Sequence, residues 1–242
     1  MKNIYKILTI FTLLVCYHTN NAQEILLFDN TPKNFEEIDN DFGPNRKKFN
    51  FSSIGIGAPL PFTIGSEETL PTQFGIYFMF NKNYKLKINN LLAIHSNLGY
   101  SSSRYYLNEN DRFKMPIQSL DAEKISYLIR NLNSNIGLQI NMKRKRGNQF
   151  GKYINLGIYG SWIFHHKLKY EYPNSNLKIN KTNLNYLEEF NFGLSAKLGI
   201  KKNAIFIKYR LSNMFKPNET NLSELPKIIA GLELDIFSKN YR

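Results

Sequence analysis

Apolar and polar residues alternate with a period of two over most of the chain after residue 48. The clearest stretch is FNFGLSAKLGI at 190–200, where every second residue from Phe190 to Ile200 is apolar. The residues between them are Asn, Gly, Ser and Lys. A helix would scatter this pattern around its circumference, so the alternation predicts a β-strand.

Seven further stretches alternate in the same way, the first two more weakly. Together they predict eight strands, near 49–57, 72–80, 92–100, 136–142, 154–159, 190–200, 205–211 and 228–236. The predicted connections alternate between longer and shorter, and the longer ones carry the Pro, Asn, Ser and charged residues. Barrels with tight turns at one end and long loops at the other show this asymmetry. The sequence therefore predicts an all-β fold, a single antiparallel up-and-down barrel of eight strands.

The composition of the two strand faces indicates which face points outward. A soluble barrel buries its apolar face, whereas a membrane barrel turns that face to lipid. The other face here is rich in Gly, Asn and Ser and carries few charges per strand, which suits a crowded interior better than a solvated surface. We therefore expect a transmembrane barrel over residues 48–238, with small and ionic side chains in the lumen.

The first 22 residues have the features of a cleaved secretory signal peptide. Lys2 and Lys6 precede the apolar run ILTIFTLLVC, and Asn-Asn-Ala comes before Gln23. A lipoprotein signal with Cys16 as the lipidated residue is the alternative, although Val15 is bulky for that cleavage. Residues 23–47 hold six acidic residues and no periodicity, and we expect a flexible or loosely docked segment there. The predicted location is the outer membrane.

The composition excludes two other classes of protein. Lys and Arg number 32 against 19 Asp and Glu, a formal net charge of +13, and hydrophobic residues make up 42%. A bundle of membrane helices needs apolar runs of about 18–20 residues, which the chain lacks. The single cysteine excludes a disulfide framework and a thiolate metal cluster.

The end of the chain resembles a known family. YRLSNMF at 209–215 precedes a polar loop, and a last strand follows, IIAGLELDIF at 228–237. With the signal ending in Asn-Ala-Gln, this is similar to the Bacteroidetes outer-membrane β-barrel proteins, including PorT-like and OmpA-type eight-strand barrels. ISYL at 125–128 resembles the start of the family's middle strand without the usual following Pro, and Pro59 and Pro61 break the first strand early. The resemblance covers roughly residues 48–238, implies an eight-strand outer-membrane barrel, and carries no catalytic residues.

Charged residues on the last strands predict an ionic network in the lumen. Lys208 and Arg210 on one strand are expected to meet Glu233 and Asp235 on the next, because a lone charge in a lumen would be costly. Further candidate members of this structural network are Lys197, His95 and Gln139. A proton path or a catalytic pair built from these groups is the less favoured reading.

Aromatic residues near strand ends suggest an interfacial girdle, with core or cross-strand packing as the equal alternative. The candidates are Tyr77, Phe80, Tyr84, Tyr100, Tyr105, Tyr106, Trp162, Phe164, Tyr170, Tyr172, Tyr209 and Phe237.

Few residues suggest catalysis or ligand binding. Ser161, His165 or His166, and Glu171 lie near one strand end, so a hydrolase at the barrel rim is conceivable. Adjacent histidines on a strand point to opposite faces, which disfavours a shared metal ion. The run KRKR at 143–146 is expected to be a solvated turn, with anionic headgroups or acidic partners as a weaker option.

These observations favour an outer-membrane barrel with a structural or interaction role, such as a component of an envelope secretion or adhesion assembly. We expect no enzyme activity, no cofactor, no metal and no nucleic acid. The expected partners are outer-membrane lipid and other envelope proteins, and the expected state is a monomer. The alternatives are a barrel enzyme acting on outer-membrane lipids at the rim, and a soluble secreted barrel binding an apolar ligand. The last of these predicts that Phe190, Phe192 and Leu194 face the cavity.

Overall fold

The computed structural model describes residues 43–61, 72–107, 124–143, 151–172, 178–182, 184–216 and 224–236. The chain divides into two compact units, residues 1–35 and 36–242, and every described residue belongs to the second. The predicted signal peptide, most of the segment 23–47, and Arg144, Lys145 and Arg146 lie outside the described residues. The described part contains no helix long and apolar enough to cross a membrane.

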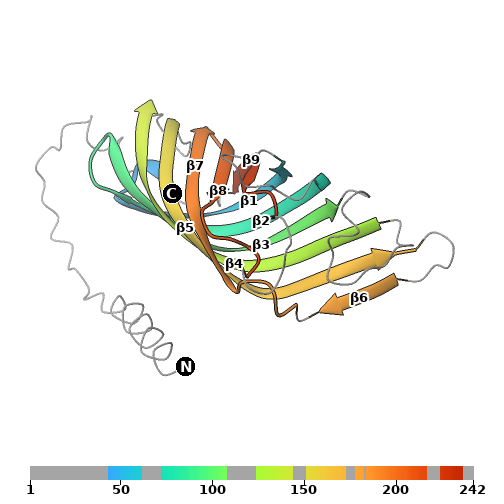
Figure 1. The fold of residues 1–242 in the computed structure, drawn as a ribbon. Helices are drawn as coiled ribbons and strands as arrows, with labels where there is room; N and C mark the ends of the chain where they lie inside the picture. The colour runs from blue at the N-terminus through green and yellow to red at the C-terminus, as the bar shows by residue number, and fades with distance from the viewer. Residues whose placement is uncertain are drawn as a thin grey trace, which may run out of the picture. The chain divides into compact units, whose positions relative to one another are not determined.

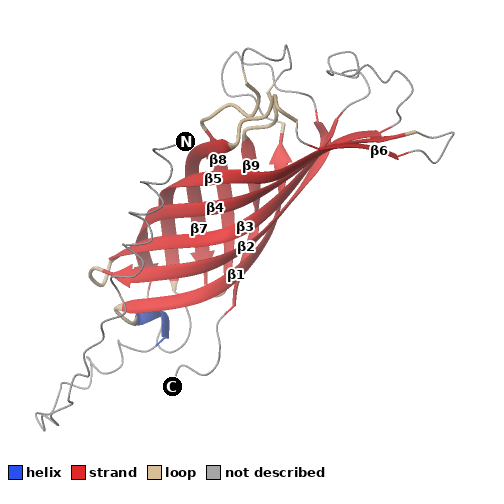
Figure 2. Ribbon diagram, turned by 90° about the horizontal axis from the view of Figure 1, so that it is seen from below, coloured by secondary structure: helices blue, strands red, loops and turns tan. Residues whose placement is uncertain are grey.

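In the described part of the chain, nine antiparallel strands form one sheet that closes on itself (Figure 1, Figure 2). After a short 3-10 turn, η1 (Gly43–Asn45), come β1 (Lys48–Leu60), β2 (Thr72–Lys87), β3 (Leu92–Leu107), β4 (Lys124–Lys143), β5 (Lys152–Glu171), β6 (Lys178–Thr182), β7 (Phe190–Ile200), β8 (Asn203–Arg210) and β9 (Ile228–Ile236). Strand β1 pairs with β9, and β4 pairs with β5, so eight strands form a ring. This confirms the all-β fold and the up-and-down arrangement of eight strands.

The ninth strand, β6, lies outside the ring, and the sequence did not predict it. Strand β5 pairs with β7 from Lys152 to Trp162 and with β6 from Lys167 to Glu171. Strands β4 and β5 are each 20 residues long, about twice what a membrane-crossing strand needs, so they continue past the ring and carry β6 (Figure 1). In the outer halves of these strands the apolar residues lie on the inward face, as Ile125, Tyr127 and Ile129 do on β4. The outward apolar alternation that the prediction followed therefore ends within each strand.

The strand bounds show that the connections differ in length at the two ends of the ring. Residues 88–91, 144–151 and 201–202 join strands at one end, which we call the short-turn end. Residues 61–71, 108–123 and 211–227 join them at the other, the long-loop end, and so do residues 172–189, which include β6. The predicted asymmetry is therefore present.

The apolar faces of the strands point outward. The side chains of Phe190, Phe192 and Leu194 are 65%, 57% and 47% exposed, while Asn191 between them is buried. The prediction that these three residues face the cavity, which came from the soluble-barrel alternative, is therefore wrong. Other exposed residues on the outer face include Ile56, Phe78, Leu98, Ile136, Leu156, Ile158, Ile205 and Leu232.

Large inward side chains lie opposite glycines on the neighbouring strand. Tyr153 on β5 faces Gly199 on β7, and Tyr159 faces Gly193. A Cβ placed on either glycine would collide with the opposite ring. The narrow lumen of an eight-strand barrel has room only for side chains, and glycine makes room for a ring beside the wall.

A β-bulge changes which residues of β5 face outward. Asn131 on β4 pairs with Ile163, but Arg130 pairs with His165, so Phe164 is an extra residue. Before the bulge the outward residues of β5 are even-numbered, as at exposed Trp162; beyond it, Leu168 is fully buried. The bulge therefore turns Lys167 and Lys169 outward.

The directions in which side chains point along each strand also correct the prediction of an aromatic girdle. Phe80, Tyr84, Trp162 and Phe164 are exposed on the outer wall, which is the side that a girdle would occupy. Tyr77, Tyr105 and Tyr170 are buried, so for these three the packing alternative holds.

Candidate functional site: the filled lumen

The lumen is the candidate site because it gathers the buried charges of the described residues. Nearest the short-turn end, the Tyr153 hydroxyl donates to Asp235 Oδ2 at 3.3 Å. The ring of His95 lies 6.1 Å from that of Phe51, and Lys85 Nζ donates to the carbonyl of Pro44 at 3.0 Å. Pro44 belongs to η1, so residues 43–47, which we expected in the flexible segment, are docked against the barrel. These contacts fill the end of the lumen.

One ion pair lies deeper in the lumen. Lys197 Nζ is 2.7 Å from Glu233 Oε2, and the Glu233 side chain is 1% exposed. The other carboxylate oxygen of Glu233 accepts a hydrogen bond from Ser53 Oγ at 2.5 Å, and Ser53 Oγ accepts one from Asn83 Nδ2 at 2.8 Å. The partner of Glu233 is thus Lys197 rather than Lys208 or Arg210. Residues 197 and 233 come together because both strands, β7 and β9, flank β8 in the ring.

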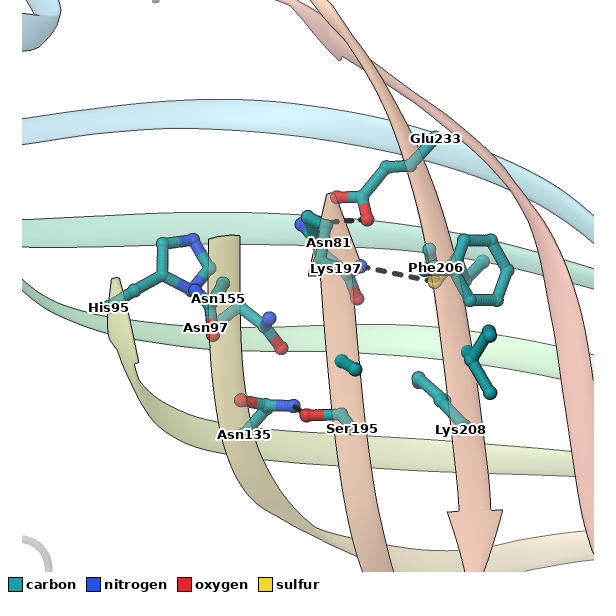
Figure 3. Close-up of a pocket in the computed structure, with 13 residues that line it drawn as sticks. Asn81, His95, Asn97, Asn135, Asn155, Ser195, Lys197, Phe206, Lys208 and Glu233 are labelled. Atoms are coloured by element: carbon teal, nitrogen blue, oxygen red, sulfur yellow. Dashed lines mark hydrogen bonds and ion pairs between the residues drawn. The ribbon is translucent and has the colours of Figure 1, made fainter. Parts of the chain in front are cut away.

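Lys208 lies at mid-height between two small cavities. Its Nζ donates to the Tyr77 hydroxyl at 2.9 Å and sits 5.3 Å from the ring centroids of both Tyr77 and Tyr159. One cavity, of about 20 Å³, is lined by Asn81, His95, Asn135, Asn155, Lys197 and Glu233 among others (Figure 3). The second, of about 30 Å³, is lined by Ser101, Asn133, Ser161, Asn191 and Arg210 among others. Lys208 lines both, and each has room for only one or two waters.

Arg210 lies near the long-loop end, under a lid of loop residues. Its Nη2 donates to the carbonyl of Leu225 at 2.8 Å and lies 3.5 Å from Glu224 Oε1. The Glu224 carboxylate also accepts the backbone N–H groups of Met214, at 2.8 Å, and Leu225, at 3.2 Å. Arg210 therefore pairs with a loop carboxylate that the sequence analysis did not name, and not with Glu233 or Asp235.

An apolar cluster closes the same end. Strand residues such as Tyr127, Ile129 and Leu168 pack with loop residues Leu187 and Phe215. The hydroxyls of Tyr127 and Tyr186 are 3.1 Å apart, and burial raises the pKa of the Tyr186 phenol, so this loop residue stays neutral. The lumen is thus covered by apolar side chains at the long-loop end and occupied by charged and polar ones below.

Asn and Ser side chains link the strands along the polar inner wall; two of these bonds join adjacent strands, and the third reaches from β4 past β5 to β7. Asn133 Nδ2 donates to Ser101 Oγ at 2.8 Å, and Ser161 Oγ donates to Asn133 Oδ1 at 2.7 Å. Asn135 Nδ2 donates to Ser195 Oγ at 2.6 Å (Figure 3). Gln139, a further candidate, is buried and donates to Asn141 instead of joining the ion pair. These bonds satisfy buried polar groups.

The candidate hydrolase residues do not converge. Ser161 is committed to Asn133, and His166 Nε2 accepts the backbone N–H of Leu184 at 2.6 Å. Five positions along one strand separate Ser161 from His166, which is about 16 Å at the usual rise. Glu171 forms an ion pair with Lys169, farther still along β5.

Sequence reasoning missed Tyr77, Lys85, Tyr153 and Glu224 as members of the site. The first three could have been found by listing every second residue on the polar face of each strand, because each of them lies at an inward position of its strand. Glu224 carries no such signal, since a loop brings it in.

Within the described ranges, no group of three or more His, Cys, Asp or Glu side chains is placed to hold a metal ion. No family model matches the chain, and no curated protein matches it.

Proposed function

We propose that this chain is an integral outer-membrane β-barrel protein with a closed lumen, and that its role is structural or interaction-based rather than catalytic. The observation that carries the proposal is the inside-out distribution of side chains. Exposed apolar residues surround the ring, and buried charged and polar residues fill it. Soluble proteins rarely expose an apolar surface of this extent, whereas a membrane barrel requires it.

The height of the apolar surface matches a bilayer. We call this surface the apolar belt; on β4 its outward positions run from Leu132 to Met142, and on β7 they run from Phe190 to Ile200, 11 residues. At about 3.3 Å per residue and a tilt of about 45°, 11 residues rise about 25 Å, the height of the apolar band of outer-membrane barrels.

The filled lumen supports a role other than a constitutive pore. Lys208, Tyr77 and Tyr159 close the middle, the Lys197–Glu233 pair lies nearer the short-turn end, and an apolar cluster covers the long-loop end. What remains free is the outer wall and the long loops. By analogy with barrels of this topology, the long-loop end faces the cell exterior. Membership of the PorT-like group, and of an envelope secretion or adhesion assembly, rests on the resemblance of the closing strands and is part of this proposal.

Cell fractionation tests the location. We expect the chain in the outer-membrane fraction, resistant to extraction by sodium carbonate, with a gel mobility that changes on heating as folded barrels show. Recovery of the folded chain from the periplasm without detergent would contradict the proposal. Replacing Ser161 by Ala and comparing membrane lipids tests the rim enzyme, and a changed acyl pattern would favour it.

A further inference from the structure

Three cations gather on the outer wall just above the apolar belt, on the side of the long loops. Arg104 on β3, Arg130 on β4 and Lys167 on β5 form this group, which we call the cationic patch. Leu128 on β4 lies directly opposite both Arg104 and Lys167. Arg130 is two positions further along β4, so it is the diagonal neighbour of both other cations, with about 7–8 Å to each across the pair of strands.

The β-bulge at Phe164 creates the patch. Without the extra residue, Leu168 and Tyr170 would face outward and Lys167 would face inward. With it, Lys167 lies on the same wall as Trp162 and Phe164. A bulge next to a binding surface commonly serves to re-aim side chains in this way.

The patch is continuous with the apolar belt. Leu132 and Trp162 pair with each other on β4 and β5, one step below Arg130, and are 48% and 44% exposed. The rings of Tyr100 and Phe164 are 6.1 Å apart across the same boundary. An elongated ligand on this wall would touch apolar side chains with one part and cations with the other.

Among the described residues, no carboxylate forms an ion pair with Arg104, Arg130 or Lys167. The ion pair on this face joins Lys169 to Glu171. Arg104 and Arg130 are exposed, and the printed contact of Arg104 is with the Tyr106 hydroxyl, at 3.4 Å. Like charges on neighbouring strands repel each other, and a bound anion would relieve that repulsion.

We propose that the cationic patch binds the phosphate headgroup of a membrane lipid whose acyl chains lie on Leu132, Trp162 and Phe164. This rests on the proposed function, because it needs the apolar belt to be in a bilayer. Arginine presents a planar fork of N–H donors that matches phosphate oxygens, and two arginines flank the site. An acidic protein would not need the patch to adjoin exposed aliphatic and aromatic side chains, so lipid is the occupant that both parts of the surface favour.

Trp162 provides the measurement, because it is the only tryptophan of the chain and lies at the patch. The wild-type barrel is reconstituted in vesicles of dioleoylphosphatidylcholine containing a fraction of brominated phosphatidic acid, whose bromine atoms quench tryptophan fluorescence. We expect Trp162 to be quenched more strongly than it would be if phosphatidic acid were distributed around the barrel at its bulk fraction. In the variant Arg104→Gln/Arg130→Gln/Lys167→Gln the affinity should fall on the order of 100-fold, from about fivefold per cation.

A matched variant separates position from net charge. Lys48→Gln/Lys82→Gln/Lys152→Gln also removes three outer-wall charges, but these are dispersed over β1, β2 and β5. It should keep the excess quenching. Equal loss in both triple variants, or none in either, would overturn the proposal. A competition experiment gives a further test. If glycerol 3-phosphate displaces brominated phosphatidic acid as effectively as unlabelled phosphatidic acid does, the acyl chains contribute nothing to binding and the proposal is overturned.

A measurement with brominated phosphatidylcholine shows whether a negative result contradicts the lipid-binding proposal alone or also the proposed location in a membrane. If this lipid fails to quench Trp162 in the wild type, the belt does not face lipid and the proposed function fails. If brominated phosphatidylcholine quenches Trp162 equally in all variants, the barrel is in the bilayer. If brominated phosphatidic acid then quenches the wild type no more than the triple variants, only the cationic patch proposal fails.

Discussion

Tyr153 on β5 lies directly opposite Gly199 on β7, and its ring occupies the space that a side chain at position 199 would need. The tyrosine is 4% exposed, and its hydroxyl donates to Asp235, so the ring cannot easily move aside. The wall of the barrel and its contents are therefore fitted to each other at this point.

Gly199→Ala should destabilise the barrel by about 1–3 kcal/mol, because the new methyl group would overlap the Tyr153 ring. Unfolding by urea in lipid vesicles, followed by Trp162 fluorescence, measures this. Gly160→Ala is the control, since a Cβ there meets nothing within 4 Å. Equal stability of the two variants would contradict the packing argument.

Replacing one partner of the Lys197–Glu233 ion pair should lower the free energy of unfolding more than replacing both partners. Lys197→Met alone leaves Glu233 buried and uncompensated, at a cost of about 3–5 kcal/mol. Lys197→Met/Glu233→Gln should recover part of this loss, because no charge remains buried. The same unfolding measurement on the two single variants and the double variant gives the coupling energy. Additive losses would mean that the two groups do not stabilise each other.

Lys208 and Tyr77 should keep the lumen closed. We expect no ionic current above background from the wild type in planar bilayers. Lys208→Ala/Tyr77→Ala removes the groups between the two cavities and should produce a measurable current. Lys82→Ala/Tyr84→Ala, which removes the same residue types from the exposed outer face of β2, should not. A conducting wild type would show that the lumen is open in the membrane.

A charge placed in the apolar belt should test its environment. Ile158 is 60% exposed in the part of β5 that pairs with β7, so in water Ile158→Arg would change stability by no more than about 0.5 kcal/mol. In a bilayer it should cost about 2–4 kcal/mol. Asn203→Arg, at the short-turn end, should be nearly neutral in either case. The free energies of unfolding in vesicles decide between these outcomes, and a neutral Ile158→Arg would argue against membrane insertion.

The amino-acid sequence by itself determined the strand count of the ring and the direction of its faces. Both follow from local features, since a period of two marks a strand, and a face of Gly, Asn and Ser marks a crowded interior. The seven candidate lumen residues also proved buried or half-buried inside the barrel, because inward parity at positions such as Lys197 and Glu233 can be read along each strand.

Only the tertiary structure decided which of these residues meet. The partner of Glu233 comes from a strand two places away in the ring, and the partner of Arg210 comes from a loop, so neither is encoded in adjacent strands. The bulge at Phe164 likewise has no sequence signature, yet it reverses the facing of every residue beyond it. The register of each strand pair depends on all the other strands of the closed ring, so it cannot be derived from one strand alone. That register determines which residues form the ion pairs, the glycine–tyrosine contacts and the cationic patch.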